Sequence, residues 1–172
     1  MYLALVRQLV RSLQNLSACL AKGAQAAADR KFDPGVLLAS RLAPDQFALL
    51  RQVQIACDSA KLSAARLSGK DAPKHEDNET TIEQLQARIA SVVAYLEAFV
   101  EADFAATDDR DISLPFVPGM TIKGRDFALE YALPNFLFHV TTAYAILRHN
   151  GVQVGKMDYL GKLSFVPVAA AT

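Results

Sequence analysis

Two of the three histidines lie in one stretch near the C-terminal end of the sequence, where they could form the polar face of a helix. This stretch, residues 134–151, begins with a proline and ends with a glycine, as helices often do. Steps of four and three place five of its residues on one face. They are Asn135, His139, Thr142, Ile146 and His149. Imidazole groups can act as bases, metal ligands or hydrogen-bonding groups, so we expect any chemistry at this face.

His139 allows two interpretations. It can be a core histidine that is hydrogen-bonded to a polar side chain of a neighbouring helix, because a buried imidazole needs a partner. It can also be a general base or a ligand-orienting group in a pocket that Asn135 and Thr142 line. An earlier helix would then contribute Gln54 and Asp58, and a nearby carboxylate would raise the basicity of the imidazole. The sequence leaves both interpretations open.

Other polar side chains have simpler structural explanations. Tyr131 and Tyr144 could line the same pocket, but tyrosines commonly pack with the hydroxyl hydrogen-bonded at the edge of a core. His149 lies in the last turn of its helix, where a cation suits the helix dipole. His75 lies in a charged loop, residues 74–77, and we expect it to be solvated.

The spacing of the histidines argues against a shared metal ion. His139 and His149 are ten residues apart, which separates their backbones by about 15 Å on one helix. Both nitrogens would need to lie within about 2.1 Å of the ion. The acidic run 107–111 lacks the glycine and glutamate of an EF-hand loop and contains Arg110, so we expect a solvated loop. We predict no cofactor, although a divalent metal at a non-histidine site stays open.

Composition narrows the class of protein. The 172 residues carry 18 basic and 18 acidic side chains, and this balance disfavours nucleic-acid binding. No apolar run approaches the roughly 18 residues of a membrane span, and Arg7 and Arg11 interrupt a start that resembles a signal peptide. Cys19 and Cys57 match no metal or redox motif and are expected to be buried thiols. We expect a soluble cytoplasmic protein that binds neither nucleic acid nor membrane.

Four long helices are needed to position these residues. Apolar side chains recur at helical spacing in four stretches, one of which places Phe47, Leu50 and Val53 in a buried stripe. The stretches run from Leu3 to Ala28, from Pro44 to Leu67, from the capping box Thr80-Thr81-Ile82-Glu83 to about Ala102, and from Pro134 to Gly151. Gly69 is expected to end the second helix.

Shorter elements connect the helices. Asp33-Pro34-Gly35 predicts an N-cap and a short helical turn through residues 36–38. Alternating apolar residues around a Pro118-Gly119 turn, expected to be type II, predict a β-hairpin at residues 111–123. A short helical turn is expected at residues 125–132.

Three segments of the sequence resemble the DinB/YfiT-like superfamily of four-helix bundles. They are residues 41–45, residues 51–58, and the block 133–151, of which the last is the most specific. Within that superfamily, the chain most resembles an uncharacterised family of bacterial and fungal proteins, a domain of unknown function. The resemblance implies an all-α fold: one DinB-like four-helix bundle over residues 1–172, with the hairpin between helices three and four and a frayed tail at 167–172.

The superfamily also implies a candidate chemistry. Many members bind a divalent metal through one histidine of the second helix and a His-x-x-x-His pair of the fourth, and some use it to activate a low-molecular-weight thiol. If His149 belongs to this pair, its partner falls on Ala145, and if His139 does, its partner falls on Ala143. The second-helix ligand falls near Gln54, whose amide is a poor ligand for zinc or nickel. We therefore do not expect a three-histidine site.

We therefore expect a non-catalytic or vestigial member of the superfamily, a homodimer that binds a small molecule or a partner. The alternative is a metal- or thiol-dependent transferase with an atypical site around His139, Gln54 and Asp58. A third hypothesis is an interaction protein with an exposed apolar face on the first or fourth helix. The residues of the candidate pocket are His139, Gln54, Asp58, Asn135, Thr142, Tyr144 and His149. Convergence of the first three on an accessible cavity would favour the transferase.

Overall fold

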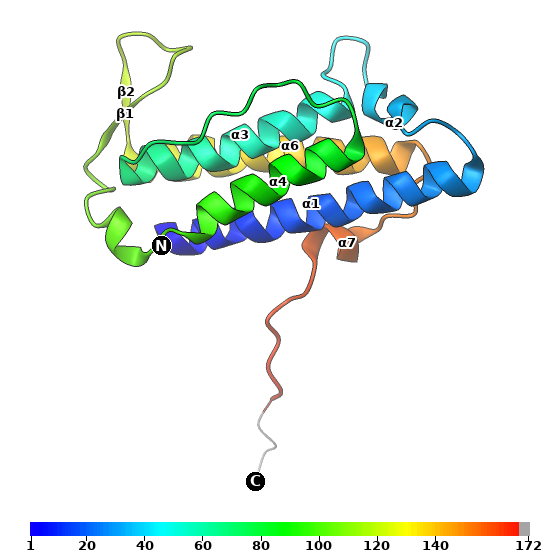
Figure 1. Cartoon of the computed structure of the whole chain (residues 1–172). Helices are drawn as coiled ribbons and strands as arrows, with labels where there is room; N and C mark the ends of the chain where they lie inside the picture. The colour runs from blue at the N-terminus through cyan, green and yellow to red at the C-terminus, as the bar shows by residue number, and fades with distance from the viewer. Residues whose placement is uncertain (169–172) are drawn as a thin grey trace.

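Four long helices form a closed bundle in the structure, a computed structural model that describes residues 1–168. They are α1 (Tyr2–Arg30), α3 (Leu49–Ser68), α4 (Ile82–Glu97) and α6 (Leu133–His149). Helices α1 and α3 each pack against both α4 and α6. Figure 1 shows that α1 and α6 run in one direction and that α3 and α4 run in the other. The predicted all-α bundle with a small hairpin is confirmed.

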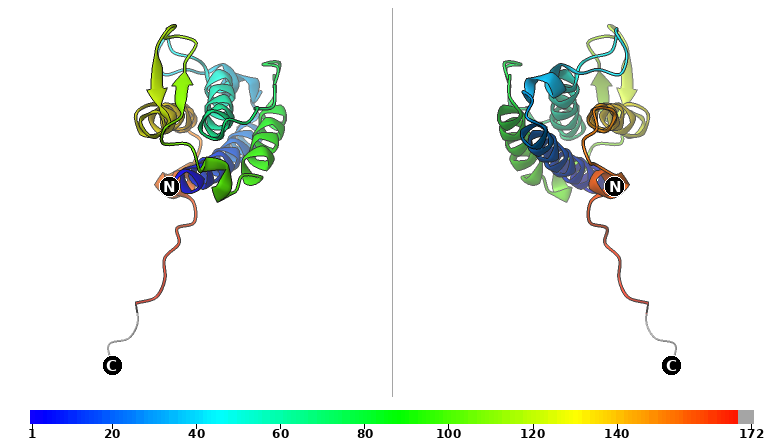
Figure 2. Two further views of the ribbon diagram at one scale, coloured as in Figure 1. Left: turned by 90° about the vertical axis from the view of Figure 1, so that its left-hand side faces the viewer. Right: turned by 90° about the vertical axis from the view of Figure 1, so that its right-hand side faces the viewer.

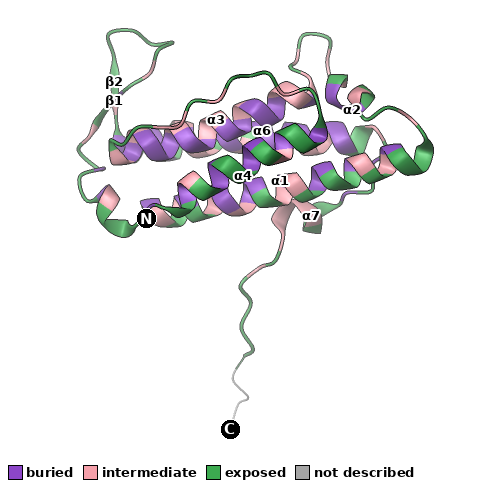
Figure 3. Cartoon of the chain, in the orientation of Figure 1, coloured by how far each residue is buried: buried purple, intermediate pink, exposed green. Residues whose placement is uncertain are grey.

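The core forms because each long helix carries an apolar stripe. In Figure 3 the buried residues follow the inward faces of the helices. Leu9, Leu13 and Phe136 are fully buried, and burial of each such side chain is worth about 1.5–3 kcal/mol. Cys19 and Cys57 are free, buried thiols, as predicted. Burial raises the pKa of Cys19 to about 11 and that of Cys57 to about 12, so neither is a reactive thiolate at neutral pH.

Helix α3 begins later than predicted. Its first residue is Leu49, and the segment from Pro44 to Ala48 consists of turns and extended backbone. Hydrogen bonds hold this segment outside the helix: the backbone N–H of Leu49 donates to the Ser40 carbonyl at 2.9 Å. Phe47, predicted in the buried stripe, is 57 % exposed because it lies in this segment. A proline at the start of an apolar helical pattern is compatible with a β-turn as well as with the first turn of the helix.

Helix α4 differs from the prediction at both ends. Its capping box joins Thr81 to Gln84, one residue later than predicted, with the Gln84 N–H donating to the Thr81 hydroxyl at 3.2 Å. The helix ends at Glu97 rather than Ala102. A separate 3₁₀ turn, η1 (Glu101–Phe104), follows it, and the carboxylate of Asp103 accepts the Val100 N–H at the start of this turn.

The predicted hairpin is present. Strand β1 (Asp111–Ser113) pairs antiparallel with β2 (Thr121–Lys123), and Ile112 lies opposite Ile122. Gly119 has a φ of 80°, which fits the type II turn predicted for Pro118-Gly119. Figure 2 shows that the hairpin projects from the side of the bundle formed by α3 and α6.

The chain after the hairpin is one continuous helical stretch rather than a turn followed by a new helix. It consists of α5 (Gly124–Asp126), a π-helical segment η2 (Phe127–Ala132), and α6. The prediction that Pro134 restarts the chain is therefore wrong. The wider turns of the π segment lie next to a proline that cannot donate an N–H to the helix.

The remaining segments connect and cover the bundle. Residues 69–81 run back along the bundle from the end of α3 to the start of α4 (Figure 1). Helix α2 (Gly35–Ala39) begins one residue later than predicted, with Pro34 rather than Asp33 at the N-cap, and the Asp33 carboxylate accepts the Gly35 N–H at 2.8 Å. A last short helix, α7 (Lys156–Leu160), packs on α1. Of the predicted tail, residues 169–172 lie outside the described residues. The described helices include none with the length and apolar character of a membrane span.

Candidate functional site

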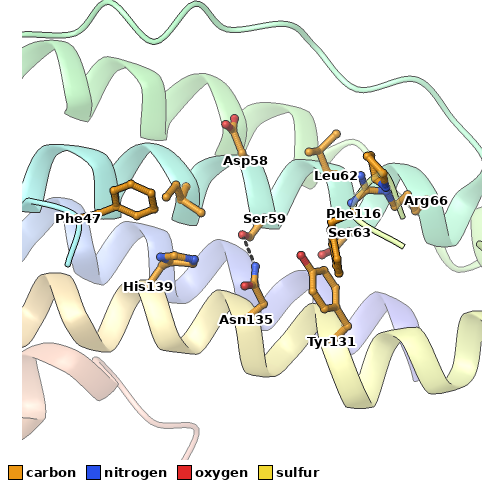
Figure 4. A pocket seen from close by; sticks show the side chains of 12 residues that line it. Phe47, Asp58, Ser59, Leu62, Ser63, Arg66, Phe116, Tyr131, Asn135 and His139 are labelled. Carbon is orange, nitrogen blue, oxygen red and sulfur yellow. Dashed lines mark hydrogen bonds between the residues drawn. The ribbon is translucent and has the colours of Figure 1, made fainter. Parts of the chain in front are cut away.

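A pocket of about 390 Å³ lies between α3 and α6, and the hairpin borders one end of it. Half of the residues that line it are apolar or aromatic: Phe47, Ile55, Leu62, Pro115, Phe116 and Tyr131. Figure 4 shows these side chains arranged along the two helices, with Phe47 and His139 toward one end and Phe116 and Arg66 toward the other. The Phe116 and Tyr131 rings lie 5.4 Å apart, and the Tyr131 and Phe127 rings 5.7 Å apart.

His139 lies at the wall of the pocket and is held by Gln52. Its Nδ1 is 2.7 Å from the Gln52 Oε1, while the Gln52 amide N–H donates to the Phe47 carbonyl at 3.0 Å. Because an amide oxygen only accepts, Nδ1 carries the proton and Nε2 carries a lone pair. Burial, and then the charge of Arg51, lower the pKa of His139. His139 is therefore neutral at pH 7, and its Nε2 has no hydrogen-bond partner among residues 1–168.

The other polar groups of the pocket come from the same two helices. The Asn135 amide donates to the Ser59 hydroxyl at 2.8 Å, which ties α6 to α3 in the middle of the pocket (Figure 4). Ser63 and Arg66 follow on α3 toward the hairpin. Asp58 is at the rim, where its Oδ1 accepts from Arg88 at 2.7 Å and from Lys61 at 2.9 Å.

The structure brings together only part of the predicted site. His139, Asn135 and Asp58 line the pocket, together with Tyr131. Gln54 faces α4 instead, where its amide donates to Glu79 at 2.8 Å. The remaining three are not in the pocket. Thr142 is buried elsewhere, the Tyr144 hydroxyl donates to the Val154 carbonyl at 3.5 Å, and His149 is exposed at the end of α6.

Gln52, the partner of His139, was missed in the sequence. The sequence contained a signal for it, since Gln52 stands three residues after Leu49 and four before Ala56, at the spacing of the buried stripe of α3. A polar residue at such a position must find a hydrogen bond inside the protein. The interpretation of His139 as a core histidine hydrogen-bonded to a polar side chain of a neighbouring helix is confirmed for Nδ1, and Gln52 is the partner.

A second polar centre, which was not predicted, lies between α3, α4 and the segment 69–81. Its central residue is Arg88, whose side chain is 1 % exposed. Arg88 donates to Asp58 at 2.7 Å, to Asp77 at 2.9 Å and to Glu79 at 3.0 Å. We call these four residues, with Lys61, the ionic cluster. It joins the rim of the pocket to the long segment that covers α3 and α4.

His75 lies beside this ionic cluster. The prediction that His75 is simply solvated is therefore wrong. Its Nδ1 is 3.0 Å from the Lys61 Nζ, and its Nε2 is 3.1 Å from the Ser91 hydroxyl. Burial, and then the charges of Lys61 and Arg88, lower the pKa of His75. The ring is therefore neutral at pH 7 and accepts a hydrogen bond from the lysine.

The lowered pKa values of the two histidines predict that the protein loses stability in mild acid. In the unfolded chain a histidine has a pKa of about 6.5. Below this pH the unfolded state binds more protons than the folded state, so lowering the pH favours unfolding. Stability should be fully present above pH 7 and fall as the pH drops through 6.5. Urea unfolding at pH 7.5, 6.5 and 5.5 measures this. His139→Gln and His75→Gln should each flatten the dependence, and a wild-type stability unchanged down to pH 5.5 would contradict the assignment.

Below pH 5 the carboxylates of the ionic cluster should extend this loss. Burial alone would raise the pKa of Asp77 and of Glu79. Hydrogen bonds and charges from Arg51 and Arg88 lower the pKa of Asp77 instead. Hydrogen bonds from Gln54 and Arg88, with the charge of Arg88, lower the pKa of Glu79. A lowered carboxylate pKa stabilises the fold above the unfolded value of about 4, and this contribution is lost as the pH falls through the folded value.

The pocket does not fit the metal site that the superfamily implies. Residues 1–168 contain no group of three His, Cys, Asp or Glu side chains that could hold an ion. The Nδ1 of His139 is taken by Gln52, and its nearest acidic neighbour in the pocket, Asp58, is held by two cations. In the acidic run, Asp108 accepts from Tyr2, and Asp111 pairs with Lys123 at 2.9 Å.

Comparison with known proteins agrees with this fold. The family model described as domain of unknown function DUF1993 matches residues 1–160. A crystal structure of a DinB family member protein from Shewanella denitrificans is 53 % identical in sequence, with a TM-score of 0.95. The match covers 98 % of this chain and 96 % of that one. No curated protein matches. The chain therefore belongs to the DUF1993 family, an uncharacterised family of DinB-like four-helix proteins.

Proposed function

We propose that this protein is a non-catalytic DinB-like module that binds a small organic molecule in the pocket between α3 and α6. The observation that carries the proposal is the pocket itself: about 390 Å³, lined by apolar and aromatic side chains on which six polar side chains converge. Sites for small molecules usually have this size and this composition. The neutral imidazole of His139 offers a hydrogen-bond acceptor to such a ligand at one end of the pocket.

The partners of the other candidate residues support a binding role over a catalytic one. The transferase hypothesis needs Gln54 and Asp58 beside His139. Gln54 is instead hydrogen-bonded to Glu79, and Asp58 is paired with Arg88 and Lys61. A carboxylate that already holds two short ionic contacts is costly to move. His139 is thus left without the second reactive group that nucleophilic or metal-assisted transfer requires.

Filling the pocket tests the proposal. Ser59→Leu adds an apolar side chain in the middle of the pocket and should weaken ligand binding at least tenfold, because leucine occupies the ligand's space. The loss of the bond from Asn135 should cost only about 1 kcal/mol of stability. Binding is measured by ligand-observed NMR with a library of small organic molecules. Ser17→Leu, in a hollow of about 310 Å³ between α1 and α4, is the matched control. Equal binding by the wild type and Ser59→Leu would exclude this pocket.

One observation favours the alternative, a transferase with an atypical site: His139 lines the pocket, and its Nε2, which has no partner among residues 1–168, could accept a proton. Elemental analysis of untagged protein purified without chelator, beside His139→Ala, tests its metal-dependent form. Stoichiometric zinc, nickel or iron that disappears in the variant would support transfer chemistry. The proposed binding role predicts the same metal content in both proteins.

The assembly and the interaction surface are further parts of the proposal. Among the described residues, the hairpin, η2 and α6 each carry at least one large apolar side chain that is exposed. They include Phe116, Met120, Leu129 and Phe138. Within the same described residues, helix α1 has no exposed large apolar side chain. An interaction face on α6 is thus better supported than one on α1. The homodimer and the cytoplasmic location stay predictions from the sequence.

A further inference from the structure

We infer that the ligand of the α3–α6 pocket is an organic carboxylate, whose acid group lies against the guanidinium of Arg66 and whose apolar body lies along Tyr131 and Phe116. This inference rests on the proposed function, since it names the chemical class of the ligand for that same pocket. It starts from a charge that the protein itself leaves without a counter-ion.

Arg66 is unlike the other arginines of the described chain. It is half-buried in the pocket wall, and no hydrogen bond or ion pair to another described residue satisfies its guanidinium. The other arginines without a polar partner, Arg7, Arg125 and Arg148, are all exposed. Arg88, which is more deeply buried, has three carboxylates around it. The guanidinium is not among the buried unpaired polar atoms of the described residues, so water hydrates it in the pocket, and a bound anion can replace that water with charge-assisted hydrogen bonds.

The remaining groups of the pocket leave its positive charge uncompensated. Asp58 is the only other charged residue of the wall, and its carboxylate is neutralised by Lys61 at 2.9 Å and Arg88 at 2.7 Å. His139 is neutral at pH 7, and burial lowers the pKa of Arg66, whose guanidinium is not deprotonated in proteins. The positive charge of the pocket therefore lies at its hairpin end, on Arg66, while Asp58 at the rim is engaged by its own cations.

A single guanidinium selects a singly charged acid. Its planar fork of N–H groups matches the two oxygens of a carboxylate, which can accept two parallel hydrogen bonds. A phosphate ester carries close to two negative charges, and the pocket offers it no second cation. A carboxylate is therefore the anion that fits this charge best.

The rest of the pocket defines the body and the far end of the ligand. The rings of Phe116 and Tyr131, 5.4 Å apart, lie next to Arg66 and offer aromatic faces, and Leu62 adds an aliphatic one (Figure 4). At the opposite end the Nε2 of His139 accepts a hydrogen bond. An acid with an aromatic or aliphatic body, and with a hydroxyl or N–H at the far end, would satisfy every one of these groups.

Matched pairs of acids and their neutral amides test the inference. The probes are 3-phenylpropanoate, octanoate and 4-hydroxycinnamate, each beside its primary amide, titrated into the ¹⁵N-labelled full chain. The wild type should bind at least one acid at least tenfold more tightly than its amide. Arg66→Gln should bring the pair to within about twofold. Arg7→Gln, which removes an exposed arginine of α1, should leave the preference unchanged. Circular dichroism shows whether Arg66→Gln is folded, and Arg66→Lys replaces it if it is not, with a reduced preference expected.

The outcomes separate this inference from the proposed function. Equal binding of acids and amides in the pocket would overturn the inference and leave the proposed function standing. An acid preference that survives in Arg66→Gln would overturn the assignment to Arg66. If none of the six probes shifts the pocket amides at millimolar concentration, the inference fails, and only the library screen with Ser59→Leu then decides the proposed function.

Discussion

Replacing Arg88 with methionine is expected to lower the free energy of unfolding by about 3–5 kcal/mol, because it leaves the buried carboxylate of Glu79 without its cation. The side chain of Glu79 is only 9 % exposed, and its distance to the guanidinium of Arg88 is 3.0 Å. Asp58 and Asp77 would also lose a partner, although each keeps a second cation, Lys61 or Arg51. Urea unfolding at pH 7.5 measures the change.

A second substitution should recover part of this loss. Glu79→Gln in the Arg88→Met background removes the uncompensated charge, so the double variant should be more stable than Arg88→Met alone. Arg7→Met, at an exposed position of α1, is the matched control and should stay within about 0.5 kcal/mol of the wild type. A loss below 1 kcal/mol for Arg88→Met would show that the ionic cluster contributes little to the fold.

Gly124→Ala is expected to cost about 3 kcal/mol and to weaken ligand binding as well. A Cβ at Gly124 would lie 2.0 Å from the backbone oxygen of Thr107, far inside the contact distance, and backbone cannot move aside as a flexible side chain can. The Gly124 N–H also donates to the Arg110 carbonyl at 2.9 Å, directly after β2. The strain must therefore displace the hairpin, whose Phe116 borders the pocket.

Gly155→Ala provides the control for this effect. A Cβ there meets only the Asp158 carboxylate, at 3.9 Å, and its backbone conformation is one that alanine adopts freely. Its stability should change by no more than about 0.5 kcal/mol. Thermal unfolding and titration with the tightest carboxylate probe measure both consequences. If Gly124→Ala behaved like Gly155→Ala, the close approach of Gly124 to Thr107 would not constrain the hairpin.

The sequence predicted the architecture because helical periodicity depends on local spacing alone. The four long helices and the hairpin follow from apolar spacing and from the turn residues that bound them. The errors lie where two local solutions compete. Pro44 fits a turn as well as a helix start, and Thr80 and Thr81 both fit an N-cap. Pro134 predicts a helix start, whereas the chain is already helical there, because the π-helical segment before it has no signature in the sequence.

The site was predicted mainly where one helix carries it, and Asp58 of α3 is the exception. His139, Asn135 and Tyr131 share the pocket face of η2 and α6, so their association follows from helical spacing. The apolar stripe of α3 from Val53 to Leu67 is buried as predicted, but which of its polar side chains reach the pocket depends on how α3 packs against α6. Gln52 and Arg88 occupy apolar stripes, and such polar exceptions could have been recognised. The role of Arg66 could not have been recognised, because its lack of a counter-ion depends on which side chains surround it in the folded protein.

The central claim is that the pocket between α3 and α6 binds a small organic molecule. The most direct test is the map of ¹H–¹⁵N chemical-shift changes when a library hit or a carboxylate probe is titrated into the wild-type chain. The account predicts the largest changes at the amides of Ser59, Ser63, Arg66, Tyr131, Asn135 and His139, and their loss in Ser59→Leu. Changes centred on another surface, or equally large changes in Ser59→Leu, would contradict it.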